Sequence, residues 1–379
     1  LMINTGAQPD NAIQDWTKAP NTYIFDIEKD KSKKGLLIPV KKAYAMWKDN
    51  SNADFSFNNP INSTDVKAYL YWEDKAGLVM SGTGYELAIR GTGENAEIEV
   101  PIDITKGKGN AVVSLNAFNP TANDYEVKWS WHVWVTDDPT ANGSTFRQGF
   151  ETRVDNTPIP NEEWKWMNRN LGATNTEFLG NDSNKSVGLM YQWGRKDPIP
   201  PLAHKDGSTY FINGKAGKYN AADFGELSYQ ATPKTGWILR NNIIGHENIV
   251  NNLKYSVNNP LKIITYAGWN GYDNTDYGTW FSDVQYKFLG TSEHDRVSWD
   301  LWSDNRKGLY SNGRKAYDRG ASATQEDRLI EADSKSYELK SPYDPCPNGW
   351  RIPSHYAGSL GSNFGNNMSP WGRLNSGAD

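Results

Sequence analysis

The sequence is poor in cysteine, in long apolar runs and in clustered positive charge. Cys346 is the one cysteine among 379 residues, so a disulfide within the chain and a multi-cysteine zinc site are both excluded. No stretch of 18 or more apolar residues occurs, so no segment is expected to span a membrane as a helix. Residues 1–15 also lack the apolar core of a signal peptide. Both a cytosolic protein and a processed form of an exported one remain open.

Positive charge is too sparse for a nucleic-acid surface. The net charge is −5 and the isoelectric point is about 5.7. Basic residues gather only at 29–34, where Asp30 and Ser32 interrupt them. A phosphate-binding surface needs clustered lysines and arginines, so we expect no nucleic-acid partner.

Signals of catalysis are also missing. The sequence contains no His-Glu-x-x-His pair, no nucleophile elbow, no Walker loop and no dinucleotide fingerprint after a strand. Cys346 lies between Pro345 and Pro347, with no basic neighbour closer than Arg351 to stabilise a thiolate, which favours a structural cysteine. His132 is expected at a surface or an interface. We predict no enzyme, no cofactor and no bound metal.

Aromatic residues are abundant. They make up 13% of the chain and include 16 tryptophans, although hydrophobic residues reach only 37% and the mean hydropathy is −0.75. Disordered chains bury no core and are poor in aromatics, whereas large rings can fill a core that has few aliphatic side chains. The composition therefore predicts a folded, β-rich protein with many loops.

Period-2 alternation of apolar and polar residues dominates residues 21–138 and predicts strands. It is clearest in residues 66–73, 96–102 and 127–135, while residues 111–117 are almost continuously apolar. The residues predicted to face a core are Val66, Ala68, Leu70 and Trp72; Ala96, Ile98, Val100 and Ile102; and Val127, Trp129, Trp131, Val133 and Val135.

Further strands are predicted at 23–26 and 36–40, followed by a short helix at 41–47. Seven or eight short strands at this spacing are typical of an immunoglobulin-like β-sandwich, here without its disulfide. The fold class we predict is mainly β, with an α+β part in the second half of the chain.

Proline and glycine divide the chain into regions. Residues 1–20 form a polar tail or leader strand and residues 21–140 the β-sandwich, to which we assign assembly or attachment. Residues 141–162 form a linker, because prolines and a glycine there break regular elements. Residues 163–379 form a second module. Within it we expect a helix at 187–194, and short strands and turns that tryptophans pin in place.

One stretch of the second module combines acids with aromatics. Asp273, Asp276 and Asp283 lie among tryptophans and tyrosines, and such a mixture suits sugar binding by ring stacking and hydroxyl hydrogen bonds. A turn-rich surface with core aromatics, a carboxylate pair for glycoside hydrolysis and a calcium loop remain alternatives. The candidate ligand-binding residues are Trp269, Tyr272, Asp273, Asp276, Trp280 and Trp302.

Three blocks carry a family resemblance. They are residues 166–173 (WMNRNLGA), 188–198 (GLMYQWGRKDP) and 341–353 (SPYDPCPNGWRIP). In this order they resemble the Fibrobacter succinogenes major paralogous domain and its relatives in Bacteroidales surface proteins. The upstream residues 110–113 and 128–137 resemble the β-sandwich that precedes this module.

The resemblance implies a C-type-lectin-like fold in the second half, export to the outer cell surface or a fimbrium (pilus), and a role in cell adhesion, with a fimbrial tip subunit as one form. The implied partners are other fimbrial or surface subunits and a glycan or protein ligand. Because family members usually continue well past the third block, we expect either a longer native chain or a shortened module. A carbohydrate-active enzyme or accessory glycan-binding protein is the main alternative, and a ligand-free surface scaffold is a third.

Overall fold

The computed structural model describes part of the chain. The described residues are 13, 15–48, 57, 59–141, 145–147, 163–165, 167–177, 183–192, 194–199, 209–212, 215–218, 227–229, 237–239, 243–244, 249–261, 265–266, 302 and 341–352. These residues form mainly β strands with a few helices, which confirms the predicted mainly β class.

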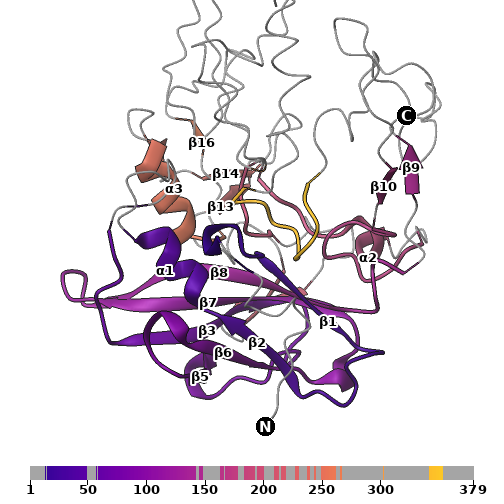
Figure 1. The fold of residues 1–379 in the computed structure, drawn as a ribbon, viewed down its shortest axis with the longest axis horizontal. Helices are drawn as coiled ribbons and strands as arrows, with labels where there is room; N and C mark the ends of the chain where they lie inside the picture. The colour runs from indigo at the N-terminus through magenta and orange to yellow at the C-terminus, as the bar shows by residue number, and fades with distance from the viewer. Residues whose placement is uncertain are drawn as a thin grey trace, which may run out of the picture.

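The two principal sheets come largely from residues 22–136 (Figure 1). The large sheet has the order β1-β8-β7-β3-β11-β12, with β4 paired to β3, and the small sheet has the order β2-β6-β5. Their bounds are β1 Thr22–Asp26, β2 Gly35–Pro39, β3 Val66–Glu73, β4 Glu86–Leu87, β5 Ile89–Arg90, β6 Glu97–Pro101, β7 Gly109–Asn119, β8 Asp124–Thr136, β11 Thr209–Ile212 and β12 Lys215–Lys218.

Smaller elements complete the described structure. Three strand pairs are β9 (Thr145–Arg147) with β10 (Glu163–Lys165), β13 (Leu227–Tyr229) with β14 (Trp237–Leu239), and β15 (Ile243–Ile244) with β16 (Thr265–Tyr266). The α-helices are α1 (Lys41–Trp47), α2 (Ser183–Val187) and α3 (Ile249–Asn258), and 3₁₀ turns lie at Trp16–Lys18, Thr83–Tyr85, Gly93–Asn95 and Ile104–Lys106. Because β9 lies between Gly143 and Pro158, the predicted linker does contain a regular element. Among the described residues, no helix is long and apolar enough to cross a membrane.

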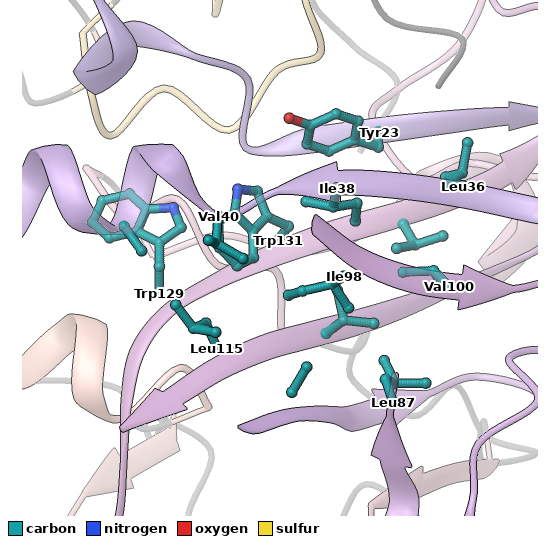
Figure 2. Packing of buried hydrophobic residues seen from close by; sticks show 14 of the residues in the cluster. Tyr23, Leu36, Ile38, Val40, Leu87, Ile98, Val100, Leu115, Trp129 and Trp131 are labelled. Carbon is teal, nitrogen blue, oxygen red and sulfur yellow. The ribbon is translucent and has the colours of Figure 1, made fainter. Parts of the chain in front are cut away.

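One hydrophobic cluster lies between the two sheets (Figure 2). Ile98 and Val100 of β6 meet Leu115 and Trp131 of the large sheet there, and each is 1% exposed or less. All four apolar residues predicted for 96–102 belong to this cluster, so the predicted alternation is confirmed for this strand. Strands that bury one face keep their register, because a slip of one residue would expose every apolar side chain.

Two bulges reverse the predicted faces of β3 and β8. The register shifts between Leu70 and Trp72, so Trp72 pairs with Val112 on the face away from the cluster. A second shift at Lys128 pairs Val127 with Asn116 on that same side. The prediction that Trp72 and Val127 share a face with the other apolar residues of their strands is therefore wrong, although both side chains are buried. An extra residue on one strand inverts the alternation beyond it.

Of the two helices predicted from the sequence, one is confirmed and the other is wrong. The predicted helix at 41–47 is α1, with the same bounds. The helix predicted at 187–194 is wrong, because α2 lies earlier and ends at Val187. Gly188 follows it with φ +82°, a conformation that commonly ends a helix at glycine.

The cluster also contains residues from far along the chain. Leu253 and Val257 of α3 and Tyr343 belong to it, together with the side chains of residues 22–136. Helix α3 packs against β8 at the same end of the sheet as α1 (Figure 1). The described parts of the second half thus share a core with the first half.

Candidate functional site

The large sheet has a second buried face, here called the outer face. Its central residues are Val112 on β7 and Ser130, His132 and Trp134 on β8. Val112 pairs with His132 across the two strands. None of the four belongs to the hydrophobic cluster. Each is 1% exposed or less. Because both faces are covered, β7 is buried along residues 109–117, which explains its nearly continuous apolar sequence.

Two segments of the second half are hydrogen-bonded to the outer face. We call the described residues of 167–199 the first arm and residues 341–352 the strap. The strap lies beside the start of β1 (Figure 1). These segments contain most of the three blocks that carry the family resemblance.

The strap is held by Asn21, which precedes β1, and by Thr22, the first residue of β1. Asn21 Nδ2 donates hydrogen bonds to the carbonyl oxygens of Pro342 and Asp344, at 2.9 and 2.7 Å. Thr22 Oγ1 donates to Pro345 O at 2.6 Å, and Thr22 also forms a parallel bridge with Pro347. Asn21 and Thr22 are each 1% exposed, so these contacts satisfy polar groups that water does not reach.

The strap keeps its shape through one carboxylate. Asp344 Oδ1 accepts from the backbone N–H of Cys346 and Oδ2 accepts from that of Ile352, each at 2.8 Å. Asp344 is fully buried. Cys346 is buried and forms no disulfide, in agreement with the structural role predicted for it.

The first arm is anchored by a buried lysine. Lys196 Nζ donates to Ser130 Oγ and to Asp197 Oδ1, both at 2.6 Å, and lies 4.5 Å from the ring centroid of Trp129. Burial lowers the pKa of Lys196 to about 8, although Asp197 acts in the opposite direction.

A lysine beside a serine can in principle activate the hydroxyl as a nucleophile. Here Ser130, Lys196 and Asp197 are 3% exposed or less, so a substrate does not reach Ser130 Oγ in this structure. The carboxylate contact also favours the charged lysine, which cannot accept a proton. The geometry is that of an anchor between the arm and the sheet.

An arginine next to the lysine anchors α3. Arg195 Nη2 donates to the carbonyl oxygens of Ser256, Asn259 and Pro260, at 2.9, 2.8 and 3.2 Å. The last carbonyls of a helix lack partners within the helix and carry partial negative charge. The guanidinium therefore caps α3 and fixes it to the first arm.

The start of the first arm is paired with the end of β8. Arg169 donates to both carboxylate oxygens of Asp137, at 2.6 and 3.2 Å, and Lys108 approaches the same carboxylate at 2.6 Å. Burial alone would raise the pKa of Asp137, but the bonds from Arg169 and Lys108 lower it well below its usual range. Such a two-point contact fixes orientation as well as distance.

Of the six candidate ligand-binding residues, the structure describes Trp302. Its Nε1 donates to Arg195 O at 2.9 Å, and the side chain is partly buried. Trp302 therefore braces the first arm. The other five, namely Trp269, Tyr272, Asp273, Asp276 and Trp280, lie outside the described residues.

The residues that build this junction had weak signals in the sequence. Ser130 and His132 stood on the polar side of a predicted strand, and Lys196 and Asp344 lay inside the blocks of the resemblance. No spacing rule joins residues so far apart in the chain. Among the described residues, no group of three or more His, Cys, Asp and Glu side chains could hold a metal ion.

No family model, curated protein or solved structure matches this chain.

Proposed function

We propose that this chain is a secreted surface adhesin, with the fimbrial tip as the location we favour. The first half would be an immunoglobulin-like sandwich that attaches or assembles the protein. The second half would be a C-type-lectin-like module that presents ligand-binding loops. The two covered sheets of residues 22–136 and the three blocks of the resemblance support this proposal.

The proposal rests mainly on one observation: the two ends of residues 200–340 are anchored close together on the large sheet. The chain enters this segment from the first arm, anchored at Ser130, and leaves it through the strap, anchored at Thr22. Thr22 pairs with His132, two residues from Ser130, on neighbouring strands. A long segment whose two ends are fixed at one place on a rigid sheet suits recognition, because binding residues concentrate on loops held by a scaffold.

Assembly with other subunits would use the edge of the small sheet. Among the described strands, β2 pairs only with β6, but all five of its residues are buried, so this edge is covered. A strand from another chain could add to it only after the covering residues move aside.

Binding to arrayed glycans and to intact cell surfaces tests the proposal, using the full chain and its Trp269→Ala, Tyr272→Ala and Trp280→Ala variants. We expect at least one ligand class to bind. We expect each variant to weaken binding about tenfold or more, because ring stacking is lost, while thermal unfolding stays unchanged. Met80→Ala is the control, since Met80 is a large apolar side chain that is 50% exposed.

Two results would contradict the adhesin. One is wild-type affinity in all three variants, or the absence of any bound surface. The other is cleavage of an arrayed glycan, which would favour the carbohydrate-active enzyme instead.

A further inference from the structure

A chain of buried hydrogen bonds crosses the outer face and ends on the strap. Asp74 accepts from Asn110 Nδ2 at 2.9 Å, and Asn110 Oδ1 lies 2.9 Å from His132 Nε2. His132 Nδ1 lies 3.0 Å from Thr22 Oγ1, which contacts Pro345 O at 2.6 Å. The Thr22 hydroxyl therefore links the His132 imidazole to the strap.

The available hydrogens define the state of the ring. Both hydrogens of Asn110 Nδ2 are used, by Asp74 and by Gly172 O. Asn110 Oδ1 can therefore only accept, and His132 Nε2 must carry a hydrogen. In the neutral ring Nδ1 is then an acceptor. The single hydroxyl hydrogen of Thr22 faces two acceptors, His132 Nδ1 and Pro345 O.

A second proton on His132 would complete this chain of hydrogen bonds, but burial opposes it. The ring is 1% exposed, and the carboxylate of Asp74 is separated from it by the Asn110 amide. Burying a charge without a contacting counter-charge costs more than one additional hydrogen bond contributes. Burial accordingly lowers the pKa of His132 to about 3.

The other charged groups around the ring are occupied. On the strap, the carboxylate of Asp344 accepts from two backbone N–H groups of the strap itself. On the first arm, Lys196 and Asp197 pair with each other at Ser130. Just after β3, burial raises the pKa of Asp74 to about 6, but Asp74 contacts Asn110 rather than the strap.

We propose that the strap is an acid-released latch, in which protonation of His132 frees residues 341–352 from β1. When the strap leaves, Tyr343 leaves the hydrophobic cluster with it. Thr22 and the ring behind it then meet water, and the imidazole can take up a proton that it refuses when covered. Any group that binds a proton more tightly in the released state shifts the balance toward release as the pH falls. Release detaches the C-terminal end of residues 200–340 from β1.

The direction follows from the burial of the docked ring, which is 1% exposed and whose hydrogen bonds go to neutral groups, Thr22 and Asn110. Between pH 7.5 and 5.5 an exposed histidine with an ordinary pKa of about 6.5 becomes mostly protonated, while the docked ring stays neutral. The released fraction should therefore rise about tenfold over this interval.

Cys346 offers a direct readout. It is the one cysteine of the chain, it lies in the strap, and its side chain is 7% exposed. The rate of its reaction with a small thiol reagent reports strap opening. Dividing by the rate of the same protein unfolded in denaturant at each pH removes the effect of thiol ionisation.

We expect the protection of Cys346 in the full chain to fall about tenfold from pH 7.5 to 5.5. His132→Gln should abolish this dependence. Asp74→Asn should keep it, because Asp74 does not contact the strap. Thr22→Val, a shape-matched change, should speed labelling at every pH while keeping the slope, so the test survives if His132→Gln does not fold.

Three results would overturn the latch. They are protection that stays constant or rises in acid, a pH slope that persists in folded His132→Gln, and a slope that disappears in Asp74→Asn.

Discussion

At the scale of residues, Lys196 illustrates what the sequence leaves unspecified. It stands in an Arg-Lys-Asp run that resembles an exposed turn, yet its ammonium is buried against Ser130, 66 positions away. A local sequence pattern carries information about residues that are close along the chain. It does not reveal this contact, because Lys196 and Ser130 come together only when the chain folds. For His132 the sequence predicted a surface or an interface, and the structure buries the side chain on the outer face, next to Thr22.

The lowered pKa of Lys196 predicts a pH effect on stability. The folded state loses the lysine proton near pH 8, whereas an unfolded lysine keeps it to about 10.4. Because the unfolded state binds more protons in between, this lysine makes stability rise with pH, by up to about 3 kcal/mol in total. Urea unfolding from pH 7.5 to 9.5 should show this rise in the wild type relative to Lys196→Met. Parallel pH profiles of the two proteins would disprove it.

At the scale of elements, regular patterns were readable and interruptions were not. The helix at 41–47 was predicted and the strand at 96–102 followed from its alternation, and each has one buried face along its length. The bulges of β3 and β8 were not predictable, because the sheet accommodates an extra residue without a glycine or proline to mark it. Helix α2 was misplaced for the related reason that Gly188, inside the predicted helix, ends the earlier one.

Gly188 gives a test at this scale. It has φ +82°, and a Cβ placed there would lie 2.6 Å from Leu171 O. Gly188→Ala should therefore destabilise the protein by about 3 kcal/mol, from the left-handed backbone and the clash together. Gly84→Ala is the matched control: φ is +70° but nothing lies within 4 Å, so about 1 kcal/mol is expected. Equal losses in urea unfolding would show that the contact with Leu171 is not limiting.

At the scale of the whole molecule, the large sheet joins the two halves. Trp72, Val112 and Trp134 are fully buried on its outer face, and Trp134 Nε1 donates to Ala173 O of the first arm. The sequence suggested a boundary near residues 141–162, because composition changes there, but composition does not reveal which faces of a sheet are covered. Fold class was accessible from pattern, whereas the junction depended on contacts between residues far apart in the chain, from 39 positions for Trp134 and Ala173 to 323 for Thr22 and Pro345.

A fragment that ends at residue 141 should therefore fold poorly. Without the first arm and the strap, the outer face would expose large apolar rings beside Ser130 and His132, and α3 would no longer cover β8. We expect such a fragment to aggregate or to bind a hydrophobic dye, with no cooperative thermal transition. A soluble fragment that melts near the temperature of the full chain would show that residues 22–136 are self-sufficient.

The parallel pairing of β1 with β8 has a mechanical consequence. The start of β1 and the end of β8 lie at opposite ends of five paired residues. A molecule tethered through its N-terminus and pulled through the chain that follows Thr136 would load those five pairs in shear, all at once. Tension applied in that direction cannot open the ladder one hydrogen bond at a time, as it would in a hairpin pulled from its open end.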